Sequence, residues 1–354
     1  MKKLILLLSI CVCFLFSCYN DEMNAINSIK KIDDGVFFLE FIGDYDFESF
    51  LAQGGSKNND DIATFITGSL SKGKWTGNKN SEDYQVTIKT PDFGCSSIIG
   101  KNQNGNPIFG RNYDWQDCSV MVIHTKPDNG YESISTSCLE FVGFDRDWEP
   151  ENNFTKDIVS LASIYVPLDG MNEKGLYIAD LIVHDNEETA QNRGNIPLTI
   201  TAAIRLVLDN AATVDEAITL LDSYDIHSVI GMAHHFAIAD KTGKSVVVEW
   251  EDNKMYVSET PVVTNHYVAD SPKGKGFVLD GDNSKIRFEK LQGLGNENNW
   301  NLDTNQIKNA LKSVSASQFS STEIAVWSCI YEPESNKITY YFRENYDKPY
   351  VIEF

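Results

Sequence analysis

The chain has 354 residues, of which 42% are hydrophobic and 23% charged, and its formal net charge is −21 at pH 7. This composition is typical of a globular protein with a sizeable core, arranged as one large domain or two. Because a polyanion gains no affinity for another polyanion from counterion release, nucleic acid is a poor partner. The charge indicates a solubilising acidic surface, and capture of a cationic substrate is the alternative.

The first 18 residues have the pattern of an export signal. Lys2 and Lys3 precede the apolar run "LILLLSICVCFLF", which is too short to span a bilayer core of about 30 Å as a helix. The run ends in "LFSC", which resembles a bacterial lipoprotein box and predicts a lipid on Cys18. We therefore expect 1–18 to be a lipoprotein signal peptide and the mature protein to be exported and anchored to a membrane of the cell envelope. Plain secretion is the alternative, because Phe16 is bulky for its place in the box.

Residues 19–94 are predicted to be a tether and a pro-segment. Residues 19–34 have the composition of a tether, "GVFFLEFIGDYDF" at 35–47 has strand composition, and 48–90 are polar with scattered Gly, Ser and Asn.

From residue 95 onward the pattern predicts strands, then helices, then strands. The apolar runs "CSSIIG" and "PIFGRNYDW" are joined by "KNQNGN", in which Asn104-Gly105 favours a tight hairpin. A capping box of Thr213 and Glu216 predicts the start of one helix. The remaining expected elements are strands at 119–126 and 131–142, helices at 196–211 and 213–224, strands at 234–240, 244–250 and 254–259, a helix at 302–314, and strands at 323–332, 337–344 and 349–354. Helices between two groups of strands favour layers of helix on sheet over a parallel βαβ arrangement.

The cysteines show no metal-binding or scaffold pattern. Cys11 and Cys13 belong to the signal. The cysteines that remain after the signal and the lipid anchor are Cys95, Cys118, Cys138 and Cys329, and none has C-x-x-C spacing. Neither a zinc site nor a disulfide scaffold is therefore indicated, and whether Cys118 and Cys138 pair is left open.

Cys95 is the candidate nucleophile. A thiol with a pKa of about 8.5 needs a base, and none of the six histidines has a nucleophile-like sequence context. If the Gly94–Cys95 bond were cut, the new α-amine, with a pKa of about 7.7–8.0, could take the thiol proton. Gly94 places no Cβ at such a strained bond, and Arg111 and Asp114 return across the hairpin toward Cys95. The carboxylate could hold the amine and the guanidinium could favour the thiolate. The alternative is that Cys95 is a buried strand residue with no chemical role.

The segment "CSSIIGKNQNGNPIFGRNYDW" resembles the mature start of the choloylglycine hydrolase family, which includes bile salt hydrolases and penicillin V acylases. The motifs "DGMNEKGL", "TVDEAITLL", "IADKTGKSVVVEW", "PVVTN" and "IRFEKL" follow in order, so the resemblance covers about 95–354. It implies that 95–354 form an N-terminal nucleophile amidase domain. The implied fold class is α+β, a four-layer αββα fold with two stacked antiparallel sheets.

The resemblance also implies roles for particular residues. Cys95 matches the nucleophile, and Arg111 and Asp114 match the pair that surrounds its thiol and amino group. Asn265 matches an asparagine whose side-chain amide donates to the oxyanion, and Arg287 matches an arginine that supports the nucleophile. The alternatives are a turn residue for Asn265 and a surface helix charge for Arg287.

Two features depart from the family pattern. Ile182 stands where bile salt hydrolases carry asparagine and penicillin V acylases often tyrosine. Its backbone N–H can still serve the oxyanion hole, but its side chain cannot hydrogen-bond a substrate. Asn172 is interpreted as a turn residue. The long segment 19–94 resembles that of acid ceramidase, which implies a pro-segment that stays bound as a second chain after cleavage.

The sequence thus predicts an enzyme that hydrolyses linear, non-peptide amide C–N bonds of a small N-acyl substrate through a Cys95 thioester, without a metal or cofactor. Acyl transfer to an amine is the alternative reaction, and an uncleaved, inactive binding lipoprotein is the alternative class. Ile182 and the pro-segment favour plain aliphatic or aryl-acyl amides over bile acid conjugates. The identity of the acyl group and amine, and whether the protein is a homo-oligomer, are left open.

Overall fold

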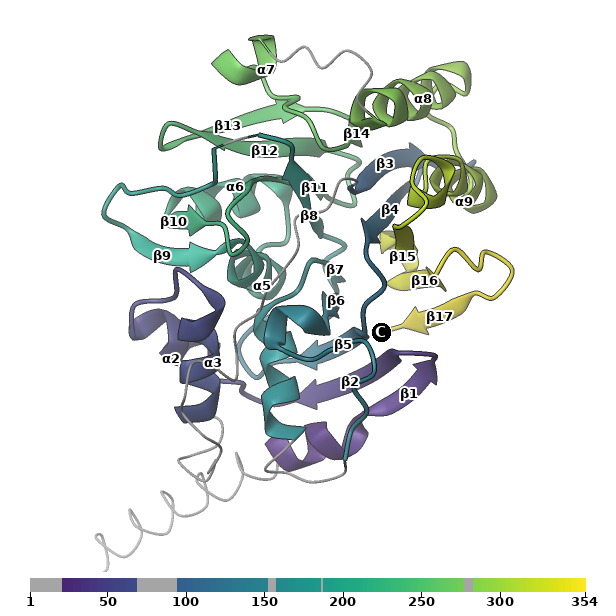
Figure 1. Cartoon of the computed structure of the whole chain (residues 1–354). Coiled ribbons are helices and arrows are strands. Elements are labelled where there is room, and N and C mark those ends of the chain that lie inside the picture. The colour runs from purple at the N-terminus through teal and green to yellow at the C-terminus, as the bar shows by residue number, and fades with distance from the viewer. Residues whose placement is uncertain (1–20, 69–93, 152–156, 186, 277–282) are drawn as a thin grey trace, which may run out of the picture.

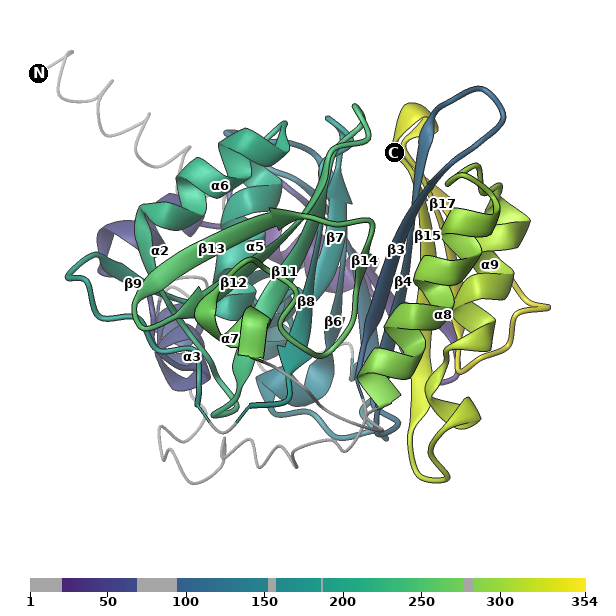
Figure 2. The same ribbon diagram turned by 90° about the horizontal axis from the view of Figure 1, so that it is seen from above.

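The computed structural model describes residues 21–68, 94–151, 157–185, 187–276 and 283–354. Two β-sheets lie face to face, and helices cover the outer face of each (Figure 1, Figure 2). The layers therefore follow the order helix, sheet, sheet, helix, which confirms the predicted αββα fold. Within the described ranges, no helix is both long and apolar enough to cross a bilayer. The predicted signal peptide and Cys18 lie outside the described residues.

The larger sheet has nine strands in the order β1-β2-β5-β6-β7-β8-β11-β12-β13. They are β1 (Lys30–Asp33), β2 (Val36–Ile42), β5 (Val120–Lys126), β6 (Ser133–Cys138), β7 (Asp169–Asn172), β8 (Tyr177–Val183), β11 (Ala233–Ala239), β12 (Ser245–Glu251) and β13 (Lys254–Glu259). Neighbours are antiparallel except β2 and β5, which run parallel. A parallel pair needs a long connection, and the chain between β2 and β5 provides one.

The smaller sheet has six strands in the order β14-β3-β4-β15-β16-β17, and all its pairs are antiparallel. They are β14 (Val262–Val263), β3 (Ser96–Lys101), β4 (Pro107–Trp115), β15 (Ile324–Glu332), β16 (Lys337–Phe342) and β17 (Tyr350–Glu353). A separate parallel pair consists of β9 (Ile196–Thr199) and β10 (Tyr224–His227). Every residue of β4 is buried, because helices cover one face of this strand and the larger sheet covers the other.

The helices lie mainly on the two outer faces. They are α2 (Phe47–Ala52), α3 (Asn59–Gly68), α5 (Ile200–Asn210), α6 (Val214–Asp222), α7 (Pro272–Gly276), α8 (Asn283–Glu297) and α9 (Thr304–Ser313), with 3₁₀ turns η2 (Leu139–Val142), η3 (Ile158–Tyr165), η4 (Ala316–Gln318) and η5 (Pro333–Ser335). Helix α5 packs on β7 and β8, whereas α8 and α9 pack on β3 and β4 (Figure 2). The Thr213 hydroxyl accepts from the Glu216 N–H and caps α6, as predicted. The strand predicted at 131–142 was too long, since β6 ends at Cys138 and η2 follows.

The β3–β4 hairpin has a five-residue loop, 102–106. Gly105 adopts a φ of 82°, so the loop uses the glycine of the predicted Asn-Gly pair for its left-handed position. The Asn102 side chain accepts hydrogen bonds from the N–H groups of Asn104 and Asn106. This local network fixes the register that places Ser97 opposite Arg111.

Aromatic side chains fill the space between the sheets. Phe109 of β4 stacks on Tyr177 of β8 with ring centroids 5.4 Å apart. Tyr113 of β4 stacks on Trp327 of β15 at 3.9 Å. The central core therefore joins both sheets directly behind the start of β3, where Cys95 lies.

The segment before Cys95 is part of the same fold. Residues 19–34 were expected to form a tether, but residues 21–28 are helical and β1 follows. Strand β2 lies at full length beside β5, and its side chains Phe37, Leu39 and Phe41 are buried. The tether prediction was therefore wrong for the described part of 19–34, because this stretch folds as a helix and as β1, which pairs with β2 in the larger sheet. The strand composition at 35–47 corresponds to β2.

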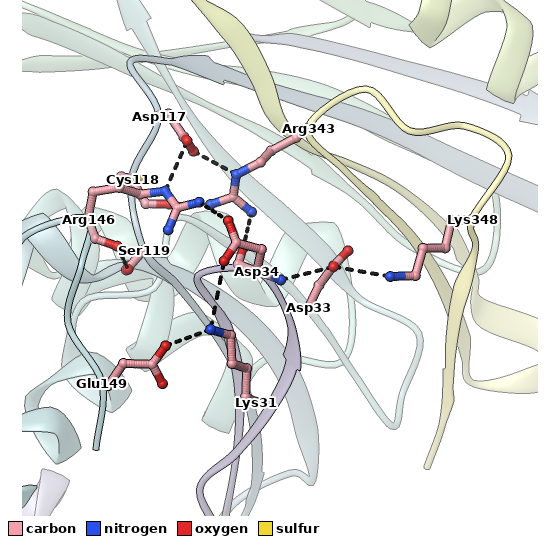
Figure 3. A network of polar contacts seen from close by, with 10 residues as sticks. All are labelled: Lys31, Asp33, Asp34, Asp117, Cys118, Ser119, Arg146, Glu149, Arg343 and Lys348. Atoms are coloured by element: carbon pink, nitrogen blue, oxygen red, sulfur yellow. Dashed lines mark hydrogen bonds and ion pairs between the residues drawn. The ribbon is translucent and has the colours of Figure 1, made fainter. Parts of the chain in front are cut away.

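A polar network joins the β1–β2 turn to the rest of the protein (Figure 3). The Asp34 carboxylate accepts a hydrogen bond from Arg146 at 2.7 Å, and the Asp34 backbone carbonyl accepts one from Arg343 at 2.6 Å. Arg146 and Arg343 also donate to the two carboxylate oxygens of Asp117, at 2.9 and 2.8 Å. Gly35, with a φ of 59°, leaves room for Arg146, which a Cβ at this position would strike. The network thus holds three segments that are distant in sequence.

Candidate active site

Cys95 lies immediately before β3 and is buried. It lines a narrow cavity that is bounded mostly by residues of both sheets and of η2. The other lining residues are Gly94, Tyr113, Asp114, Trp115, Phe141, Leu168, Asp180, Ile182, Ile230 and His234. The fold therefore gathers three of the predicted site positions, Gly94, Asp114 and Ile182, around the candidate nucleophile.

Arg111 reaches Cys95 from the space between the sheets. Its guanidinium donates to the Cys95 sulfur, to Asp169 Oδ2 at 3.2 Å and to the Asp180 carbonyl at 2.6 Å. Burial raises the pKa of the Cys95 thiol, and the Arg111 charge opposes that rise. Arg111 is thus placed as predicted, where a positive charge favours the thiolate.

Asp114 approaches from another side. Side chains alternate between the two faces of a strand, so residues three positions apart point to opposite faces. Asp114 therefore points toward the α8–α9 layer, whereas Arg111 points into the space between the sheets. Asp114 Oδ1 accepts a hydrogen bond from the Ala316 N–H at 3.2 Å, and Asp114 Oδ2 is buried with no hydrogen-bond partner among the described residues. Burial raises the pKa of Asp114 to about 8, against the opposing charge of Arg287. This carboxyl is therefore poised to gain a partner.

Asn265 holds the junction before Cys95. A Cβ at position 94 would collide with the Asn265 side-chain amide, so the close packing requires glycine there. Asn265 Nδ2 donates to the Ile182 carbonyl at 2.7 Å, and its Oδ1 accepts from Arg287 at 2.7 Å. The Asp180 N–H donates to the Leu168 carbonyl. Backbone N–H groups two residues apart in a strand point to the same edge, so the Ile182 N–H also points to this edge of β8, beside the cavity.

Arg287 is fully buried on α8, which excludes the alternative of a surface helix charge. Its Nη1 donates to the Cys95 carbonyl at 2.5 Å and to Ser96 Oγ at 2.8 Å. With its contact to Asn265, this side chain fixes the backbone on which the Cys95 thiol is carried.

Asp169 is a site residue that the sequence analysis did not single out. Its carboxylate accepts from Arg111, from Trp327 Nε1 at 2.7 Å and from the Tyr331 hydroxyl at 2.9 Å. It orients the guanidinium that contacts Cys95. The signal was available, because Asp169 opens the motif "DGMNEKGL".

His234 was also not singled out, yet it lines the Cys95 cavity. Its Nδ1 lies 2.9 Å from Asp180 Oδ1, and its Nε2 lies 3.1 Å from Ser228 Oγ. Both ring nitrogens already have partners, so the geometry does not present His234 as a base for the thiol.

Other sequence interpretations concern structural residues. Asn172 donates to the carbonyls of Leu208 and Ala211 and accepts from Lys174 and Leu176, so it fixes a turn, as interpreted. Cys118 and Cys138 are both buried free thiols. Among the described residues, no group of three or more His, Cys, Asp or Glu side chains is placed to hold a metal ion.

Comparison with known proteins places this geometry in a family. The family model described as "Acyl-coenzyme A:6-aminopenicillanic acid acyl-transferase" matches residues 150–347, more than half of the chain. The chain belongs to this family, and the resemblance to choloylglycine and N-terminal nucleophile hydrolases is confirmed.

Two curated relatives align with parts of the chain. Penicillin V acylase of Pectobacterium atrosepticum is 31% identical over 113 residues, 27% of this chain and 29% of that protein. Bile salt hydrolase/transferase of Clostridium perfringens is 26% identical over 182 residues, 48% of this chain and 51% of that protein. The chain thus spans about half the length of these relatives or less.

Solved structures match over a longer range. A variant of conjugated bile acid hydrolase from Clostridium perfringens has a TM-score of 0.54 and 19% identity, covering 73% of this chain and 92% of that one. Penicillin V acylase from Agrobacterium tumefaciens has a TM-score of 0.51 and 19% identity, covering 73% and 86%. At this identity the likeness establishes the shared fold.

Proposed function

We propose that this protein hydrolyses linear amide C–N bonds of small N-acyl substrates, after cutting its own chain between Gly94 and Cys95. The observation that carries the proposal is the unpartnered Asp114 Oδ2, buried in the cavity of Cys95. A buried carboxylate oxygen without a partner is costly. Cleavage would create an α-ammonium group at Cys95, and that group is the donor this oxygen lacks.

The proposed reaction uses the cysteine twice. Its α-amine takes the thiol proton, and the sulfur attacks the substrate carbonyl to form a tetrahedral oxyanion. The second N–H of Asn265 Nδ2 and the Ile182 N–H donate to that oxyanion. The leaving amine takes the proton and departs, and water then hydrolyses the Cys95 thioester to release the acid.

Acyl transfer is the second candidate reaction. The printed names of the family and of the Clostridium perfringens relative both include a transferase, which supports it. In transfer, an amine replaces water in attacking the thioester. Added acceptor amine would then divert product from free acid to a new amide, whereas a strict hydrolase would release the same amount of acid.

The decisive test compares wild type with Cys95→Ala by intact-protein mass spectrometry and by amide hydrolysis. We expect two fragments and activity for wild type, but one uncut, inactive chain for the variant. Cys329→Ala, which alters another buried strand cysteine, is the matched control and should stay cleaved and active. An uncut wild type with full activity would exclude the free-amine mechanism, and an uncut, inactive wild type would favour the binding-lipoprotein alternative.

The leading segment is proposed to remain bound as a second chain after cleavage. Support comes from the full-length pairing of β2 with β5 and from the polar network around Asp34 (Figure 3). Size-exclusion chromatography of the cleaved protein should yield both fragments in one peak. Separation without denaturant would contradict the proposal.

Export and lipid anchoring are proposed from the sequence of the first 18 residues. Cys18→Ala should move the protein from the membrane fraction to the soluble exported fraction. Unchanged fractionation of this variant would count against a lipid on Cys18.

The preferred substrates are proposed to be amides with a plain aliphatic or aryl-acyl group. Ile182 lines the cavity and offers no polar side-chain atom to a conjugated bile acid. We expect a higher kcat/KM for an N-acyl amino acid, an N-acylethanolamine or penicillin V than for glycocholate. A tenfold preference for glycocholate, equivalent to about 1.4 kcal/mol in the barrier, would overturn this assignment.

A further inference from the structure

The loop between β10 and β11, residues 228–232, forms one wall of the Cys95 cavity through Ile230. Of the described residues that line this cavity, all but Ile230 are buried. The cavity leaves room for little more than a water molecule, so a wall must move before an acyl group can reach the sulfur. The other lining residues lie in strands, next to them or in η2, so the loop is the wall that moves at the lowest cost.

A serine side chain holds this loop in shape. Ser228 Oγ accepts hydrogen bonds from the Ile230 N–H at 3.2 Å and from the Met232 N–H at 3.1 Å. Gly231 lies between these two donors and has a φ of 71°, which suits glycine. The Ser228 hydroxyl therefore sets the place of the Ile230 side chain.

His234 connects the serine to the Cys95 site. His234 Nε2 lies 3.1 Å from Ser228 Oγ, and His234 Nδ1 lies 2.9 Å from Asp180 Oδ1. A carboxylate only accepts hydrogen bonds, so His234 Nδ1 carries a proton and donates it to Asp180. Backbone N–H groups occupy both lone pairs of Ser228 Oγ, so the hydroxyl proton is directed at His234 Nε2. Each polar atom from the carboxylate to the loop thus has one defined role.

Asp180 serves both the loop and the nucleophile. The Asp180 carboxylate contacts His234, whereas the Asp180 backbone carbonyl accepts a hydrogen bond from Arg111 at 2.6 Å. Arg111 in turn donates to the Cys95 sulfur. The same residue therefore fixes the guanidinium beside the sulfur and the histidine that supports the loop.

We propose that Asp180, His234 and Ser228 are positioning residues that hold the 228–232 loop against the Cys95 cavity, and that Ile230 limits the width of the acyl group that enters it. This inference rests on the proposed amidase function. In a thioester mechanism the amine leaves while the acyl group stays on the sulfur, so the acyl group is the part that must fit beside Ile230.

The test measures kcat/KM for amides of one amine whose acyl group widens from acetyl through isobutyryl to phenylacetyl. Ile230→Ala removes bulk from the wall and should raise the phenylacetyl-to-acetyl ratio of kcat/KM by about tenfold or more. Ser228→Ala releases the loop and should raise this ratio by about fivefold, the equivalent of one net hydrogen bond, through KM rather than kcat. Val229→Ala is the matched control, because Val229 is a partly buried side chain of the same loop that does not line the cavity, and it should keep the wild-type ratio.

Two conservative changes distinguish positioning from a purely structural role. Ser228→Thr retains the hydroxyl and should keep the wild-type ratio. Asp180→Asn weakens the contact to His234 but leaves the backbone carbonyl that Arg111 uses, so it should shift the ratio as Ser228→Ala does. Asp180→Asn decides the positioning role if Ser228→Ala does not fold. Circular dichroism and fragment formation, followed by mass spectrometry, verify the fold and the cleavage of each variant.

The outcomes separate this inference from the proposed function. If Ile230→Ala is folded and cleaved but keeps the wild-type ratio, or if the change follows the width of the amine instead of the acyl group, the assignment of Ile230 is wrong and the amidase function stands. If Ser228→Ala keeps the wild-type ratio, or lowers kcat equally for every amide, the positioning role is wrong. If wild type cleaves no acyl amide, the proposed function fails and this inference fails with it.

Discussion

The leading segment, residues 21–68, and the domain that follows from Gly94 bury apolar side chains in the same core but hold their polar groups differently. Phe37, Leu39 and Phe41 of β2 are as completely buried as any residue of the central strands. The ion pairs of the β1–β2 turn are partly exposed, however, with the Asp34 side chain 77% accessible. Beside Cys95, in contrast, Arg111 and Asp169 form a pair with no exposure.

This difference indicates that the two regions are stabilised by different interactions. Exposed ion pairs contribute little stability, so the leading segment is held mainly by its apolar strand and helices. The buried charges of the later domain are costly unless they are paired, and their arrangement fixes the reacting cysteine. The leading segment should therefore respond to loss of apolar volume, and the later domain to loss of single polar atoms.

The largest expected effect is a loss of stability when an apolar side chain of the leading segment is truncated. Phe37→Ala removes a fully buried ring that packs edge-on against Trp148 at 5.0 Å, and should lower the free energy of unfolding by about 3–5 kcal/mol. Phe38→Ala, on the half-buried face of the same strand, is the control and should cost clearly less. Equilibrium urea unfolding measures both. Equal, small effects would mean that β2 is only loosely attached.

In the later domain, Asp114→Asn keeps the size of the side chain but removes its charge. We expect the kcat of amide hydrolysis to fall by about a hundredfold or more, because the proposed α-ammonium loses its partner. We also expect self-cleavage to slow. The measurements are steady-state kinetics and the time course of fragment formation on a gel. Near wild-type turnover would remove Asp114 from the mechanism.

The raised pKa of Asp114 gives a pH test in the uncut Cys95→Ala chain. A carboxyl with a pKa of about 8 when folded and about 3.9 when unfolded binds more protons in the folded state between these values. The free energy of unfolding should therefore fall as pH rises from about 5 to about 8, relative to a Cys95→Ala/Asp114→Asn chain. The relative loss should be at least about 1.4 kcal/mol, the equivalent of one pKa unit. Parallel pH profiles of the two chains would contradict the buried, unpartnered carboxyl.

The smallest effect is expected at the polar joint between the regions. Arg343→Ala removes contacts to Asp117 and to the Asp34 carbonyl and should lower the free energy of unfolding by about 1 kcal/mol or less, with a weaker effect at high salt. Arg193→Ala, which breaks ion pairs with Asp222 and Asp225 within the later domain, is the matched control. In urea, the Arg343 variant alone should release the leading fragment earlier. A loss several times larger would mean that the network, rather than the apolar core, holds the segment.

The sequence by itself determined many of the strands and the starts of α6 and α9, because alternation, the Asn-Gly loop and capping residues act over a few positions. It began the helix expected at 196–211 too early, since Ile196–Thr199 form β9 and α5 starts at Ile200. It also pointed to Cys95, Arg111, Asp114, Asn265 and Arg287 through motifs that resemble a family, and the fold brings these residues together. It missed the role of residues 21–33, since a short strand such as β1 has no periodicity long enough to distinguish it from a tether.

Only the tertiary structure decided where the leading strand pairs and which groups meet at the cysteine. The parallel pairing of β2 with β5 joins residues some eighty positions apart, and no local pattern specifies such a partner. Asp169 orients Arg111 from the opposite sheet, and α3 and η2 meet at Phe141 across the Gly94–Cys95 junction. These contacts depend on the distance between surfaces after packing, which one-dimensional spacing does not contain.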